Sequence, residues 1–200
     1  MSLFVDERCG LLVDDILGFW FGRPGEQDHG EPREAWWLKD PMFDAEIRSR
    51  YLDHHRRAVA GELDPMAQTA EGALALVLLL DQFSRNMFRG KAESYAGDQH
   101  ARKVARQALD ASFDQAVPPL WRWFFYVPFE HSEALADQDL SVSLFEALPE
   151  HTGRDAAIAA ASRHREIVAR FGRFPHRNGI LGRETTPEET AFLKQPNSSF

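Results

Sequence analysis

Apolar residues recur every three or four positions along most of the chain, which is the spacing of one face of an α-helix. Alternation of apolar and polar residues with a period of two, the sign of a half-buried strand, is hard to find. We therefore expect an all-α protein with seven to eight helices. The predicted helices span residues 7–19, 44–60, 69–88, 92–111, 120–126, 132–148, 155–171 and 186–193.

Local signals mark several of these boundaries. Gly172 follows a predicted helix, and glycine readily takes the left-handed conformation that ends one. Thr186 and Glu189 have the spacing of a capping box for the last helix. Pro128 is expected to break the aromatic helix 120–126, because proline cannot donate a backbone hydrogen bond inside a helix.

The connections between the predicted helices are short, and no stretch has the composition of a linker. Short connections make successive helices antiparallel neighbours. We therefore expect stacked helical hairpins in a solenoid-like arrangement, with a closed bundle as the alternative. A single domain should span residues 1–200.

The composition narrows the class of protein. A chain of 200 residues with 44% hydrophobic and 27% charged residues is typical of a globular domain and excludes wholesale disorder. The longest apolar run, 73–80, is far shorter than the ~20 residues of a membrane span. A net charge of −8 argues against general nucleic-acid binding. The single cysteine and the lack of a signal-peptide pattern predict a cytoplasmic protein.

Charged residues lie on an apolar face of the predicted helix 69–88. The apolar run 73–80 continues at four-residue spacing into Asp81, Arg85 and Arg89. Because buried charges must be paired, one interpretation is an ion pair that holds the end of the helix. The other is that Arg85 points into a cleft and Asp81 positions it.

A second polar group lies near the C-terminal end. His164 falls in the middle of the apolar face of the predicted helix 155–171, where a histidine is more often a core residue than a ligand. The turn after that helix contains a proline, which keeps the preceding residue extended. Residues 163–183 include six arginines and one acid, so this stretch is basic in an otherwise acidic chain. These arginines could equally pair with acids elsewhere. The polar residues of the turn are Arg173, His176, Arg177 and Asn178.

Glu130 and His131 form a third group, directly before the predicted helix 132–148. The free N–H groups and the dipole at a helix N-terminus would lower the pKa of His131 there. The alternative is that these residues only cap the helix.

Motifs of the common enzyme classes are absent, including the nucleophile elbow, the Walker A loop and the dinucleotide fingerprint. One cysteine excludes a paired-cysteine zinc site. We predict no metal site, and the sequence indicates no cofactor. A metal site is conceivable from Asp81, His131, Glu133 and His164. Their spacing in the sequence, however, is not a metal-ligand pattern that would require one.

Four separated motifs resemble the bacterial family of unknown function called DUF924. They are ILGFWFG at 16–22, LLDQFSRNMFRG at 79–90, PFEHSE at 128–133 and RFGRFPHRN at 170–178. The resemblance extends over about residues 12–193 and implies an all-helical, tetratricopeptide-like fold. It implies no activity, but the three polar groups lie within its motifs.

Our leading hypothesis is a cleft that binds a small anionic ligand or a peptide carboxylate, because guanidinium groups match the oxygens of carboxylate and phosphate. One alternative is a hydrolase-like enzyme that uses the same cleft for general acid/base catalysis. Another is a scaffold that binds peptides through exposed aromatics such as Trp121 or Trp123. The oligomeric state is left open. The candidate ligand-binding residues are Arg85, Arg89, Arg173, His176, Arg177 and Asn178, and the candidate catalytic residues are Asp81, Glu130, His131 and His164.

Overall fold

The computed structural model describes residues 3–26, 29–196 and 198–199, and over these residues the chain is helical without a strand. This confirms the all-α prediction. Short 3₁₀ turns at 34–36, 64–68, 92–95, 113–116 and 175–177 connect the helices. The α-helices are α1 (Leu3–Phe21), α2 (Pro41–Val59), α3 (Ala70–Leu80), α4 (Gln82–Met87), α5 (Asp98–Asp110), α6 (Pro119–Glu130), α7 (Leu135–Glu146), α8 (Arg154–Phe171) and α9 (Pro187–Phe192).

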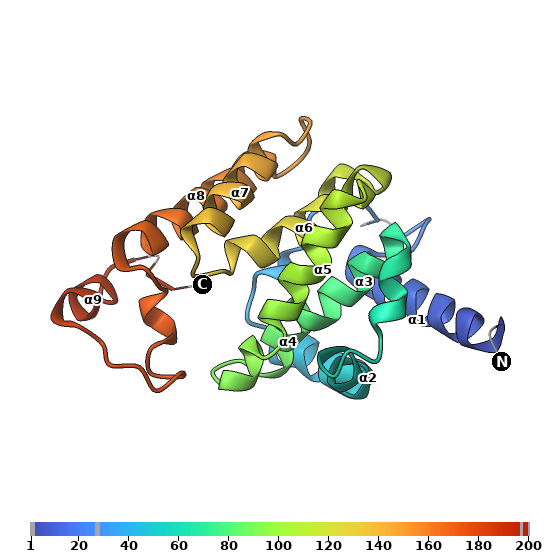
Figure 1. Cartoon of the computed structure of the whole chain (residues 1–200), viewed down its shortest axis with the longest axis horizontal. Helices are drawn as coiled ribbons and strands as arrows, with labels where there is room; N and C mark the ends of the chain where they lie inside the picture. Colours follow the sequence, from blue (N-terminus) through green and yellow to red (C-terminus); the bar gives the residue numbers. More distant parts are fainter. Residues whose placement is uncertain (1–2, 27–28, 197, 200) are drawn as a thin grey trace.

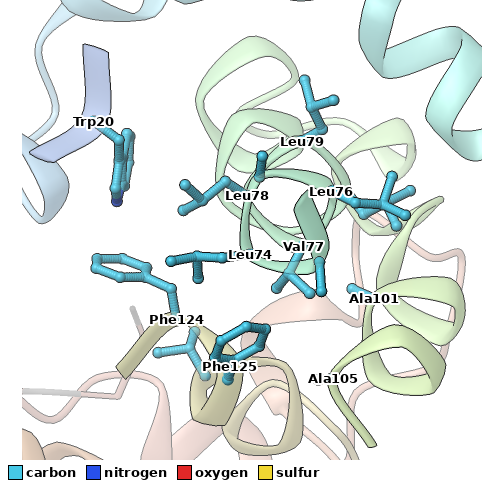
Figure 2. Close-up of a cluster of buried hydrophobic side chains, with 14 of the residues drawn as sticks. Trp20, Leu74, Leu76, Val77, Leu78, Leu79, Ala101, Ala105, Phe124 and Phe125 are labelled. Atoms are coloured by element: carbon cyan, nitrogen blue, oxygen red, sulfur yellow. The ribbon is translucent and has the colours of Figure 1, made fainter. Parts of the chain in front are cut away.

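Helix α3 lies at the centre of the larger part of the molecule, in contact with α1, α2, α5 and α6 (Figure 1). Its residues 73–80 are apolar on every side, and each is at most 1% exposed. Figure 2 shows these side chains directed outward from α3, toward Trp20, Phe124 and the alanines of α5. A helix without a polar face can only be stable when surrounded in this way.

The predicted helix 69–88 is divided at Asp81, which ends α3 and begins α4. The prediction of one continuous helix was therefore wrong. Two tertiary features meet at this point. The Asp81 carboxylate binds His131, and the backbone of Gly97 lies so close to the Leu80 carbonyl that a Cβ would be 2.3 Å from its oxygen.

Two further boundaries differ from the prediction. The range 92–111 begins with a 3₁₀ turn, and the α-helix starts only at Asp98. Pro128 lies inside α6 rather than ending it, because burial of Phe125 and Phe129 on either side offsets the lost backbone hydrogen bond. As a consequence, Glu130 is the last residue of α6, and α7 begins only at Leu135.

Helices α7 and α8 pack side by side and join the larger part through α6 (Figure 1). Beyond them a second, small apolar cluster forms between the end of α8, the following segment and α9. Gly172 ends α8 with a φ of +67°, and the predicted capping box of Thr186 and Glu189 is present at α9. The tetratricopeptide-like arrangement and the single domain over 1–200 stay predictions.

Among the described residues, no helix combines the length and the apolar composition needed to cross a bilayer.

Candidate functional site

Several polar residues gather where the α3–α4 junction, the start of α5, the end of α6 and α8 meet the segment after α8. These elements are far apart in the sequence, so only the fold brings the side chains together. We call this group the polar cluster. It consists of Asp81, Arg85, Tyr95, Asp98, Glu130, His131, His164 and Arg177.

The innermost pair is Asp81 and His131. Asp81 is 1% exposed, and its Oδ1 lies 2.8 Å from Nδ1 of His131, while Gln82 donates to Oδ2 at 2.6 Å. Burial alone would raise the pKa of Asp81, but Arg85 and then His131 lower it well below its usual range. The carboxylate is therefore ionised and can only accept, so Nδ1 of His131 carries the proton.

Burial lowers the pKa of His131, and the nearby Arg85 guanidinium lowers it further against the opposing effect of Asp81. The imidazole is therefore neutral at neutral pH. The sequence predicted a lowered pKa but the wrong cause. His131 follows the last residue of α6 as its C-cap and does not lie at a helix N-terminus.

Two guanidinium groups flank a single carboxylate at the outer side of the polar cluster. Arg85 binds Asp98 through two hydrogen bonds of 2.8 and 3.1 Å. Nη1 of Arg177 lies 3.8 Å from the same carboxylate and donates at 3.0 Å to the backbone carbonyl of His131. The Arg177 guanidinium packs between the rings of Tyr95 and Phe174, at 4.8 and 4.4 Å from their centroids.

The charge of Arg177 is poorly compensated. The residue is only 7% exposed, and its Nε is buried without a hydrogen-bond partner among the described residues. Burial and the repulsion from Arg85 lower the pKa of Arg177 to about 10. Buried charges are normally paired and hydrogen-bonded, so this guanidinium is unusual.

Glu130 and His164 form a second carboxyl–imidazole pair, with 3.0 Å between Oε1 and Nδ1. Burial, followed by the negative charge of Asp81, raises the pKa of Glu130 to about 8. Burial, followed by the neighbouring His131, lowers the pKa of His164 to about 3. Two carboxyl groups of the polar cluster are thus in opposite states at neutral pH, with Asp81 ionised and Glu130 protonated.

Glu133 attaches the segment after α8 to the rest of the cluster. Its carboxylate accepts from the Phe174 N–H at 2.8 Å and from Arg183 at 2.7 and 3.0 Å. In the same segment, burial and then the charge of Arg177 lower the pKa of His176 to about 4. The same segment carries Arg177, which donates to the backbone carbonyl of His131, and Phe174, whose ring contacts His164.

Four predicted site residues are not part of the polar cluster, namely Arg89, Arg173, His176 and Asn178. Arg89 binds Asp44 of α2 at 2.6 and 3.0 Å. Arg173 binds Glu189 of α9 at 2.6 and 2.9 Å, and Asn178 donates to the same carboxylate at 3.3 Å. These residues do not lie together with Arg85. Their location therefore does not support the predicted role in ligand binding.

Sequence reasoning missed Tyr95 and Asp98. Both fall in the range predicted as the helix 92–111, where neither interrupts an apolar face, so the sequence carries no signal for them. Their importance comes from the turn before α5, which directs them toward Arg85 and Arg177.

Two surface hollows lie elsewhere, one of about 540 Å³ along α2 and one of about 290 Å³ beside Arg173 and Glu189. Neither is lined by a residue of the polar cluster. Within the described ranges, no three His, Cys, Asp or Glu side chains are grouped as a metal site requires.

The family described as "Bacterial protein of unknown function (DUF924)" matches residues 16–197. The chain belongs to the DUF924 family. This confirms the resemblance seen in the sequence motifs. A solved structure of a DUF924-like chain, the protein of unknown function ATU0120 from Agrobacterium tumefaciens, is 44% identical. It covers 92% of this chain and 98% of its own, with a TM-score of 0.81. No curated protein matches this DUF924 chain.

Proposed function

We propose that this DUF924 protein binds a small anionic ligand at the outer edge of the polar cluster, beside Arg85, Arg177 and His131. The observation that carries the proposal is the buried guanidinium of Arg177. Its nearest carboxylate oxygen is 3.8 Å away and already accepts a hydrogen bond from Arg85. An anion held by Nη2 of Arg177, from which no described residue accepts, would supply the missing negative charge.

Only a small fraction of each side chain at the edge of the polar cluster is exposed. The exposed fractions of the side chains are 19% for Arg85, 14% for His131 and 8% for Arg177. This favours a small molecule, or the carboxylate at the end of a peptide, over an extended chain. The aromatics expected to line a peptide groove are occupied, since Trp121 stacks on Phe21 at 4.3 Å and Trp123 is 4% exposed.

A second candidate function is general acid/base catalysis in the same place, favoured by the Asp81–His131 pair. A buried carboxylate that orients an imidazole is the arrangement of a general base. Arg85 and Arg177 would then stabilise negative charge that develops on the substrate. The cytoplasmic location inferred from the sequence is compatible with either function and stays a prediction.

The test is a thermal-shift and calorimetric titration with acetate, succinate, citrate, phosphate and sulfate at constant ionic strength. We expect at least one anion, at 100 times its Kd, to raise the Tm of the wild type by roughly 5–10 °C. Arg177→Gln should abolish the shift. The matched control Arg173→Gln, which removes an arginine paired with Glu189 outside the cluster, should retain it. An absence of any shift, or an equal loss in both variants, would contradict the proposal.

A further inference from the structure

The tautomer of His131 restricts which anion the site can hold. Nδ1 donates to the ionised Asp81 carboxylate at 2.8 Å, and that carboxylate is fixed from its other oxygen by Gln82. A neutral imidazole has one donor and one acceptor nitrogen. Nε2 of His131 is therefore an acceptor.

No residue in the described part of the chain donates to this acceptor. Nε2 makes no hydrogen bond to any described residue, and unlike Nε of Arg177 it is not closed off from solvent. The side chain of His131 is 14% exposed. A ligand at the edge of the cluster therefore meets Nε2 as a group that can only accept a hydrogen bond.

The donors for the anionic part come from two arginines of the same polar cluster. Arg177 is anchored by its Nη1 to the backbone carbonyl of His131 itself, and no described residue accepts from its Nη2. Arg85 lies within 3.6 Å of the carboxylate that holds the His131 ring. An anion-binding donor and a neutral acceptor thus belong to the same polar cluster.

We propose that the ligand is a small hydroxy acid, whose anionic group binds Arg177 and whose neighbouring hydroxyl donates to Nε2 of His131. This inference rests on the proposed function, because it requires an anion at the same edge of the cluster. A hydroxyl suits the site better than an ammonium group, since Arg85 and Arg177 would repel a second positive charge.

The acceptor also explains why an acid without a hydroxyl is a poorer ligand. Such an acid would cover Nε2 without offering it a donor, and an unpaired buried acceptor is costly. For this reason, a site that hydrogen-bonds one group of its ligand discriminates strongly against an analogue without that group.

The test compares matched pairs of acids by isothermal titration calorimetry at pH 7.5 and constant ionic strength. The pairs are glycolate and acetate, lactate and propionate, and malate and succinate. We expect the hydroxylated member of at least one pair to bind the wild type about tenfold or more tightly. His131→Gln should reduce that preference to about twofold or less while anion binding persists.

The matched control is His100→Gln, which removes an imidazole held by a carboxylate, Asp64, at 2.8 Å outside the cluster. It should keep the preference of the wild type. Equal affinity for both members of every pair in the wild type would overturn the inference and leave anion binding intact. A preference that survives in His131→Gln would also overturn it. If no acid binds the wild type, the proposed function fails and this inference fails with it.

A measurement on the wild type covers the case in which His131→Gln does not fold. ¹⁵N NMR of the imidazole should show a protonated Nδ1 and an unprotonated Nε2, and lactate but not propionate should shift the Nε2 resonance. The opposite tautomer, or equal shifts with both acids, would overturn the inference.

Discussion

Glu130 and His131 are adjacent in the sequence, yet their side chains enter different surroundings. Successive side chains at the end of a helix point about 100° apart, so Glu130 meets His164 while His131 meets Asp81. Burial without a cation keeps Glu130 protonated, with its pKa raised to about 8. Arg85 and His131 keep Asp81 ionised instead. Two carboxyl groups whose pKa values are driven apart can serve different roles in one site.

The raised pKa of Glu130 predicts a pH dependence of stability. Its folded value of about 8 exceeds the ordinary value of 4.5, so the stabilisation is complete below pH 4.5 and is lost as the pH rises through 8. Glu130→Gln removes this titration. The free energy of unfolding of the variant, relative to wild type, should therefore increase between pH 5 and 8 by up to about 1.4 kcal/mol per pH unit.

Urea unfolding of both proteins at pH 5, 6, 7 and 8 measures this difference. Glu71→Gln, at an exposed position in the first turn of α3, is the control and should run parallel to wild type. A profile of Glu130→Gln that is also parallel to wild type would show that Glu130 does not titrate differently on folding.

At the scale of elements, the junction of α3 and α4 with α5 positions the polar cluster. Gly97 directly precedes α5 and lies against the carbonyl of Leu80, the last residue of α3. This close approach brings Asp98 within reach of Arg85, which lies in the last turn of α4. Any side chain at Gly97 would push the two helices apart.

Gly97→Ala should therefore lower the free energy of unfolding by about 3 kcal/mol, because its Cβ would lie 2.3 Å from a backbone oxygen that cannot move freely. Gly10→Ala is the matched control, since Gly10 lies exposed within α1 with open space around it. Alanine there should raise stability by roughly 0.5–1 kcal/mol. Urea unfolding measures both, and a Gly97→Ala protein as stable as wild type would contradict the close packing.

At the scale of the whole molecule, the segment after α8 closes the polar cluster from one side. It is connected to the larger part through Glu133, which binds the Phe174 N–H and Arg183, and through Arg177. Its own apolar cluster with α9 is small. The segment should therefore depend on these polar contacts more than α3 does, whose buried residues 73–80 pack toward apolar side chains such as Trp20 and Phe124 (Figure 2).

Glu133→Ala should loosen this segment without unfolding the core. We expect amide hydrogens in residues 172–185 to exchange about tenfold faster or more, as the loss of hydrogen bonds to a charged group implies. Those of α3 should keep their protection. The control Glu62→Ala breaks an exposed pair with Arg57 and should leave 172–185 unchanged. Unchanged exchange in Glu133→Ala would show that the apolar contacts alone hold the segment.

Much of the site could be predicted from residues whose charge conflicts with their surroundings in the sequence. Asp81 and Arg85 continue an apolar run, and His164 interrupts an apolar face, so each was expected to be buried with a partner. Arg89 carries the same signal and Arg173 was selected from the arginine-rich turn, but they are bound by Asp44 and Glu189. Nothing in local spacing distinguishes an arginine bound by an acid elsewhere from one held in the cluster.

The sequence by itself determined the all-helical fold and membership of the DUF924 family, because helical periodicity, caps and motifs are properties of short stretches. Only the tertiary structure decided where α3 ends, that α6 continues through Pro128, and which acid each arginine meets. Those outcomes depend on contacts between residues tens of positions apart, such as His131 with Asp81 and Arg177 with Asp98. Their energies are set by burial and by the charges nearby, and both exist only once the chain has folded.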